Sequence, residues 1–199
     1  MRNRVLRRWG AGLSLVVLGI AIGRLFDVLP AIAQEGTEDA PAQASETVPE
    51  GQPRYLAAMR TELEHMGIAE FACQATDAQR AMCELTQHGS SSGRDYRLRA
   101  LYSDRTDTVY LYVERYLVAP QDGAGTNALM RRLMELNWQM LLGKFEWDPT
   151  DGEVRLAMIL NTDSNFDRRA FRSSVRGLTQ LADRYWSELD RIQRATPAP

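Results

Sequence analysis

The sequence predicts an α+β domain in which an antiparallel sheet of about five to six strands is flanked by three helices. Three segments carry apolar residues at helical spacing, and the segments between them alternate apolar and polar residues as strands do. Short turns rich in Asp and Thr join neighbouring strands into hairpins, which force antiparallel pairing. The expected order is α-β-β-β-α-β-β-α, which excludes a doubly wound parallel sheet.

The first helix is expected to begin at Pro53, because proline suits the first helical turn, and to end at Gly67, because glycine commonly follows the last turn. Four apolar residues share one face of this helix: Tyr55, Met59, Leu63 and Met66. Phe71 and Cys73 then alternate with polar neighbours, which predicts a strand.

The clearest hairpin spans residues 95–118. Just before it, residues 82–87 fit a strand, although residues 78–85 also fit a helical turn. If Ser103 lies opposite Thr108, the apolar faces of the two hairpin strands match. This register pairs Leu98 with Val113, Ala100 with Leu111, Arg99 with Tyr112 and Arg97 with Glu114. The two arginine pairs would carry a cation–π contact and an ion pair on the solvated face.

The C-terminal part predicts a helix, a hairpin and a long final helix. Residues 127–140 form an apolar helical face, and residues 145–158 form two strands around an Asp-Gly turn. The final helix, residues 167–193, carries an apolar seam that fits a core helix better than a coiled coil. The polar residues at 163–167 fit its N-cap better than a calcium loop, because the required later glycine and glutamate are missing.

The N-terminus has the layout of a bacterial export signal. Residues 1–33 carry five arginines against one aspartate, and an uncharged apolar run at residues 9–23 precedes a small-x-small site at residues 31–33. The alternative is an uncleaved anchor over residues 9–29. Both alternatives place the following domain outside the cytoplasm, either in the periplasm or on the inner membrane.

The rest of the chain divides into a tether, one domain and a short tail. Residues 34–52 are acidic and nearly free of large apolar residues, so a disordered tether is expected there. The folded unit is expected over residues 53–193, and residues 194–199 are expected to be a frayed tail. A domain of this size buries enough surface for a stable core.

A family resemblance covers residues 129–192 best. The stretch LMRRLMELNWQMLLGKFEWDPTDGEVRLAMIL joins a leucine-rich helix that ends in Leu136-Asn137 to a strand at Gly143-Lys144-Phe145 and a DGEV hairpin. This order resembles the YbjN-like family of bacterial proteins, in an exported variant. The resemblance implies the type III secretion chaperone-like fold, a homodimer, and binding of polypeptide segments without catalysis.

Cys73 and Cys83 lie ten residues apart and would face one another if their segment is a hairpin. A disulfide is then sterically feasible, and an exported protein meets an oxidising compartment. Two buried free thiols are the alternative. A catalytic redox pair is disfavoured because the sequence has no CxxC motif.

The best candidates for a partner surface are aromatic and arginine residues of the central hairpin. They are Arg97, Arg99, Tyr110, Tyr112 and Tyr116. Such residues are enriched in protein interfaces. An ordinary solvated sheet face is the alternative explanation.

Composition argues against several other functions. The net charge of −2 gives no sign of a nucleic-acid partner, and two cysteines with two histidines leave little material for a zinc site. The sequence has no GxSxG, HExxH or phosphate-binding motif, so we expect no enzyme, metal or cofactor.

We expect a binding module of the cell envelope that holds a polypeptide segment or another envelope protein. The alternative is a structural or stress-related envelope protein without a specific client.

Overall fold

The computed structural model of the protein describes residues 51–163 and 165–195. The expected export signal at residues 1–33 and the tether up to residue 50 lie outside the described residues, as do residues 196–199. Within the described part of the chain, no helix is long and apolar enough to cross a membrane.

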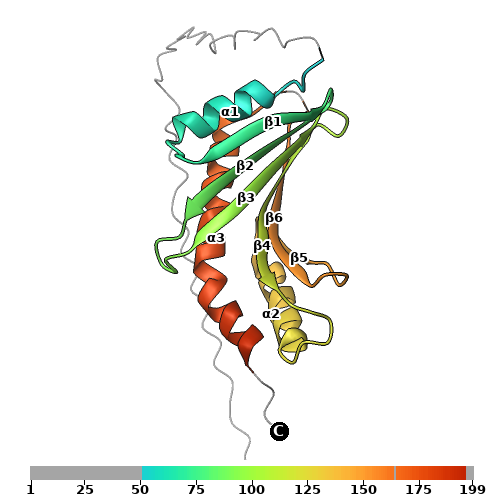
Figure 1. Ribbon diagram of the computed structural model, residues 1–199, viewed down its shortest axis with the longest axis vertical. Coiled ribbons are helices and arrows are strands. Elements are labelled where there is room, and N and C mark those ends of the chain that lie inside the picture. The colour runs from blue at the N-terminus through green and yellow to red at the C-terminus, as the bar shows by residue number, and fades with distance from the viewer. Residues whose placement is uncertain (1–50, 164, 196–199) are drawn as a thin grey trace, which may run out of the picture. The chain divides into compact units, whose positions relative to one another are not determined.

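The described chain forms three helices and a six-stranded antiparallel sheet, which confirms the expected α+β class (Figure 1). The strand order is β1-β2-β3-β4-β6-β5, so the last hairpin places β6 beside β4 and leaves β5 at the edge. In chain order the elements are α1 (Leu56–His65), β1 (Phe71–Asp77), β2 (Arg80–His88), β3 (Asp95–Ser103), β4 (Thr108–Val118), α2 (Thr126–Gln139), β5 (Lys144–Trp147), β6 (Glu153–Asn161) and α3 (Arg168–Arg194).

The helices cover one face of the sheet, and the core lies between the two layers (Figure 1). α1 contacts β1 and β2, α3 contacts β4 and β6, and α2 contacts β5. Every second residue of β2, β3 and β6, and of β4 as far as Val113, turns toward the helices. A fully buried aliphatic side chain of this kind contributes about 1.5–3 kcal/mol relative to an exposed one.

α3 is a core helix, as its sequence pattern predicts. Asp167 caps it by accepting a hydrogen bond from the N–H of Ala170 at 2.8 Å, which confirms the expected N-cap. The seam residues at the centre of the buried stripe are Phe171, Val175, Leu178, Ala182 and Leu189. The stripe packs on the sheet, so the seam forms part of the core.

The strand registers follow the predicted alternation. Ser103 lies opposite Thr108 in the pairing of β3 with β4, as predicted. Three of the four predicted residue pairs are directly opposite in this register, and the fourth, Arg97 with Glu114, forms an ion pair. β2 begins at Arg80 and alternates buried and part-exposed residues. The alternative of a helical turn at residues 78–85 is therefore wrong.

A buried carboxylate joins the first helix to the last. Glu62 on α1 accepts hydrogen bonds from the guanidinium groups of Arg168, at 3.1 Å, and Arg172 on α3. Burial by itself opposes ionisation of Glu62, but these two hydrogen bonds outweigh it and lower the pKa of Glu62. α1 is thereby fixed against the N-terminal half of α3.

A second buried carboxylate fastens the β2–β3 loop to the middle of α3. The backbone N–H groups of Ser91 and Ser92 each donate to the Asp183 carboxylate at 2.8 Å. The loop approaches so closely that a Cβ added at Gly89 would lie 2.4 Å from Asp183 Oδ1. Hydrogen bonds from the Ser92 side chain and from both backbone N–H groups lower the pKa of Asp183 to about 2.

The junction between α2 and β5 is closed by Asn137. Its side chain accepts from the N–H of Phe145 at 2.7 Å and donates to the carbonyl of Phe145 at 3.0 Å. Lys144 Nζ donates to the carbonyl of Asn137 at 2.7 Å. The Leu-Asn and Gly-Lys-Phe segments that carry the family resemblance therefore form one hydrogen-bonded junction.

Candidate functional site

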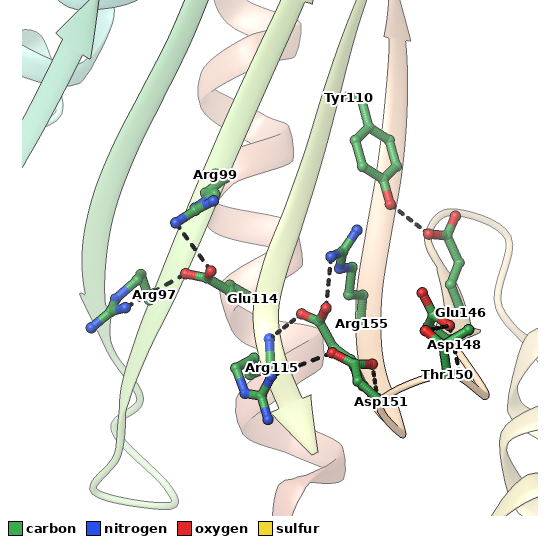
Figure 2. A network of polar contacts seen from close by, with 11 residues as sticks. Arg97, Arg99, Tyr110, Glu114, Arg115, Glu146, Asp148, Thr150, Asp151 and Arg155 are labelled. Atoms are coloured by element: carbon green, nitrogen blue, oxygen red, sulfur yellow. Dashed lines mark hydrogen bonds and ion pairs between the residues drawn. The ribbon is translucent and has the colours of Figure 1, made fainter. Parts of the chain in front are cut away.

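The sheet face opposite the helices and the adjoining β5–β6 turn carry several separate groups of paired polar side chains (Figure 2). The first group joins β2, β3 and β4. Arg99 lies 3.0 Å from Glu84 and 3.1 Å from Glu114, and Arg97 lies 3.6 Å from Glu114. The expected ion pair between Arg97 and Glu114 is thus present. Because two guanidinium groups face two carboxylates, this group carries no net charge.

The second group centres on Arg155 of β6. Its guanidinium lies 4.7 Å from the ring centroid of Tyr112, so the cation–π partner of Tyr112 is Arg155 rather than the expected Arg99. Arg155 also donates to Glu153 at 2.6 Å, and the backbone N–H of Arg115 donates to the same carboxylate at 2.8 Å. The hydrogen bond from Arg155 is the main cause that lowers the pKa of Glu153. Tyr112, only 5% exposed, lies beneath these charges.

The third group joins Tyr110 of β4 to the β5–β6 hairpin. Burial and the hydrogen bond that Tyr110 donates to Glu146 raise the pKa of the Tyr110 hydroxyl. Asp148 accepts from the side chain and the N–H of Thr150, which lowers the pKa of Asp148. Both shifts move the pKa further from neutral pH, so Tyr110 stays neutral and Asp148 stays ionised there, as these side chains ordinarily are. These contacts favour structural roles over proton transfer.

Two guanidinium nitrogens on this face have an unused hydrogen. Among the described residues, the Nε atoms of Arg99 and Arg155 are buried without a hydrogen-bond partner. Arg155 also borders a hollow of about 250 Å³ beside Trp147 and Pro149. These buried nitrogens are not accessible to a partner, and the charged groups of the open face are largely paired with one another.

Tyr116 does not belong to this surface. Its side chain is 2% exposed, and its hydroxyl donates to the carbonyl of Ala182 on α3 at 2.9 Å. The cause is a register shift between Val113 and Leu117, where Arg115 adopts a φ of 44°. This irregularity ends the alternation of β4, so Tyr116 turns toward the helices.

Cys73 and Cys83 form a disulfide between β1 and β2. They are directly opposite in the register, and their Cα atoms lie 4.0 Å apart. Within the described residues there is no free cysteine. The bond joins the outermost strand to a strand of the core.

Large apolar side chains gather at the end of α2 and in the loop that follows it. Trp138 and Leu141 are 92% and 94% exposed, and Met134 and Leu142 are also exposed. We name these four residues the α2 patch. Exposed apolar clusters are typical of surfaces that contact proteins, membranes or ligands. The apolar helical pattern of residues 127–140 does not show that Trp138 faces outward.

The outer edge of β6 is only half covered. β5 pairs with Val154–Ala157, whereas Met158–Asn161 pair with β4 on their inner side. Among the described residues, no backbone group hydrogen-bonds the outer side of this second segment. Free strand edges usually carry charges or proline, but this one exposes Ile159, at 63%.

An apolar groove of about 350 Å³ lies between this edge and α3. Met158, Leu142 and Leu181 line it, together with Ser173, Gly177 and Arg184 of α3. We name it the β6 groove. Sequence reasoning missed it. The signal that could have found it is the unequal length of the last two strands.

The described residues contain no cluster of His, Cys, Asp or Glu that could hold a metal ion. The described residues form an α+β fold with three helices on one face of an open antiparallel sheet. This agrees with the fold that the resemblance predicts.

No family model and no curated protein matches this chain. Among solved structures, it is similar to a chain in the crystal structure of the ExsC–ExsE complex, with a TM-score of 0.50 and 16% identity. The similarity covers 69% of this chain and 97% of that chain. At this identity the similarity shows the fold alone, and membership of the YbjN-like family stays a prediction.

Proposed function

We propose that this protein is a non-catalytic, chaperone-like module that holds an extended segment of another polypeptide. The observation that carries the proposal is the free edge of β6 beside the apolar β6 groove. A free edge supplies main-chain hydrogen bonds, and a neighbouring pocket selects side chains, which is a recurring mode of peptide recognition. The fold similarity to a chain from the ExsC–ExsE complex is in keeping with such a role.

The proposed place of work is the bacterial cell envelope, and the proposed family is the YbjN-like family in an exported form. The support is the sequence of the N-terminal 33 residues and the Leu129–Leu160 stretch. The motif residues of that stretch have definite structural tasks. Asn137 closes the α2–β5 junction, and Gly152 adopts a φ of 76° in the Asp-Gly turn.

We further propose that the α2 patch joins two copies of the chain. The patch is continuous along α2 and its following loop, and burial of a side chain such as Trp138 or Leu141 contributes roughly 1.5–3 kcal/mol. The open sheet face, with Arg97 exposed and Arg99 and Tyr110 half-buried around the covered Tyr112, is proposed as a secondary polar contact for the client.

Affinity capture with the tagged full-length chain tests the proposal. The chain is purified from the envelope fraction, and co-eluting proteins are identified by mass spectrometry. We expect a client with wild type that is lost with Ile159→Lys, because a charge at the free edge opposes strand addition. A weaker reduction is expected for Arg97→Ala combined with Arg99→Ala. The control is Asp163→Lys, a charge change at another exposed site.

A client retained equally by wild type and Ile159→Lys would contradict the role of the free edge. A preparation in which nothing co-elutes with wild type would contradict the binding function. That result would favour the alternative, a structural or stress-related envelope protein without a specific client.

A further inference from the structure

We infer that the β6 groove accepts an aliphatic side chain of an added strand whose neighbouring residues on the same side are acidic. This inference names the client chemistry and rests on the proposed function. It is carried by three independent features: a free strand edge, a glycine in the floor of the groove, and arginines of α3 that have no carboxylate partner among the described residues, of which Arg184 lines the groove.

The first feature fixes the conformation of the client. Along Met158–Asn161, every second residue of β6 turns its N–H and C=O groups outward, as on any sheet edge. A segment that satisfies them is itself an extended strand and continues the line of β5. Its side chains then alternate between the β6 groove and the open face beside Ile159.

The second feature is Gly177 in the middle of α3. Glycine weakens a helix interior relative to alanine, and here the fold does not require it. A Cβ at this position meets nothing within 4 Å, and φ is not positive. The missing side chain leaves space between Met158 and Leu181, which is the space that a branched aliphatic side chain of a client needs.

The third feature is a row of arginines. Arg169, Arg176 and Arg184 are exposed, and helical spacing places them beside Ser173, Gly177 and Gln180. Within residues 51–163 and 165–195, no carboxylate forms an ion pair with any of these three arginines. By contrast, Arg172 and the arginines of the open face are paired.

The positive charge of these three arginines determines which kind of polypeptide can bind in the β6 groove. A second copy bound edge to edge through β6 would bring two such arginine rows together, which like-charge repulsion disfavours. A client whose groove-facing residues read acid, aliphatic, acid would place a carboxylate on either side of the pocket. We therefore assign the groove to a separate acidic polypeptide segment rather than to a second copy.

The test uses the full-length chain and a defined probe. The probe is the fluorescein-labelled peptide Gly-Ser-Glu-Thr-Ile-Thr-Glu-Ser-Gly, in which both glutamates and the isoleucine face one side of a strand. Binding is followed by fluorescence anisotropy. We expect saturable binding that weakens about tenfold or more with Gly177→Leu, which fills the pocket, and with Ile159→Lys, which charges the edge. Ala57→Leu adds the same side chain to an exposed position of α1 and should leave the Kd unchanged.

A charge exchange makes the test specific. With Arg184→Glu, binding of the glutamate peptide should weaken, and a peptide with lysine in place of both glutamates should bind more tightly than it binds wild type. Circular dichroism and thermal melting show whether each variant is folded, and Ile159→Lys replaces an exposed residue, so it serves if Gly177→Leu does not fold.

Four results would overturn the inference. One is equal binding by wild type, Gly177→Leu and Ile159→Lys. Another is conversion of a dimer to a monomer by Ile159→Lys, which would assign the groove to a second copy. A third is equally tight binding of a synthetic peptide of residues 34–50, which would assign it to the chain's own acidic segment. Absence of binding to wild type would also overturn it, whereas the proposed function would still be decided by the capture experiment.

Discussion

At the scale of single residues, each buried carboxylate in the described part of the chain accepts a hydrogen bond from a residue distant in the sequence. Glu62 is held by α3, Glu153 by strands β4 and β6, and Asp183 by the β2–β3 loop. An unpaired buried charge would be strongly destabilising, and each of these groups has a lowered pKa. The ionised carboxylate is therefore part of the folded structure at each position.

For Asp183, the dependence of stability on ionisation of the carboxylate can be measured as a function of pH. Its pKa is about 2 in the folded protein and 3.8 in a model peptide, so its contribution to stability is fully present above the higher value. The contribution is lost as the pH falls from about 4 to about 2. We expect the free energy of unfolding, measured by urea denaturation, to fall more steeply over this window for wild type than for Asp183→Asn. The exposed control Asp163→Asn should follow wild type, and parallel curves for wild type and Asp183→Asn would contradict the assignment.

At the scale of elements, the Cys73–Cys83 disulfide stabilises the attachment of β1 to the rest of the sheet. β1 is an edge strand whose residues are mostly exposed, and the Cys73–Cys83 bond ties it to the buried side of β2. The bond closes a short loop, which stabilises the folded state by restricting the unfolded chain.

We expect Cys73→Ala combined with Cys83→Ala to lower the free energy of unfolding by about 2–3 kcal/mol. The double variant should retain the circular dichroism of wild type, because the core residues of β2 to β6 stay in place. Addition of dithiothreitol should destabilise wild type by a similar amount and leave the double variant unchanged. An effect of the reductant on the double variant would show that the loss has another cause.

Local patterns predicted the elements because their causes are local. Alternation and turn residues fix a hairpin, so the register of β3 and β4 followed from residues 95–118. The position of β6 between β4 and β5 depends on packing between residues some 40 positions apart, which no local pattern contains. For this reason Arg155 was not foreseen as the partner of Tyr112.

The candidate sites also divide into features that local sequence determines and features that depend on long-range packing. The disulfide was predictable from the spacing of two cysteines on one hairpin. Tyr116 was misplaced because strict alternation ends at Arg115, where a positive φ in a non-glycine residue has no sequence signature. The β6 groove was missed because it forms where β5 stops short, which is a property of two strands and α3 together.

At the scale of the whole molecule, three surfaces have separate proposed tasks. The α2 patch is apolar and exposed, the β6 groove combines an apolar floor with a basic rim, and the open face is polar and internally paired. The α2 patch and the β6 groove share Leu142, but the substitutions proposed for the three surfaces lie at different residues, so each task can be tested separately.

The α2 patch should control the association state. We expect wild type to behave as a dimer in size-exclusion chromatography with light scattering, and Trp138→Ser combined with Leu141→Ser to behave as a monomer. Both side chains are more than nine-tenths exposed, so the replacement should leave the melting temperature of the isolated fold nearly unchanged. Gln74→Ser, on the exposed part of β1, is the matched control. A monomeric wild type would contradict the proposed dimer.

The link between Glu62 and the arginines of α3 also sets an order of events during synthesis. The hydrogen-bonded residues are separated by 106 and 110 positions, whereas the strands of the first hairpins are neighbours along the chain. Because the chain is synthesised from its N-terminus, these hairpins can form early. Glu62 of α1 can form its hydrogen bonds with Arg168 and Arg172 only after nearly the whole domain has been translated. Until α3 has been made, the apolar face of the sheet is not covered by the longest helix. An incomplete chain is therefore more exposed to aggregation than the finished domain.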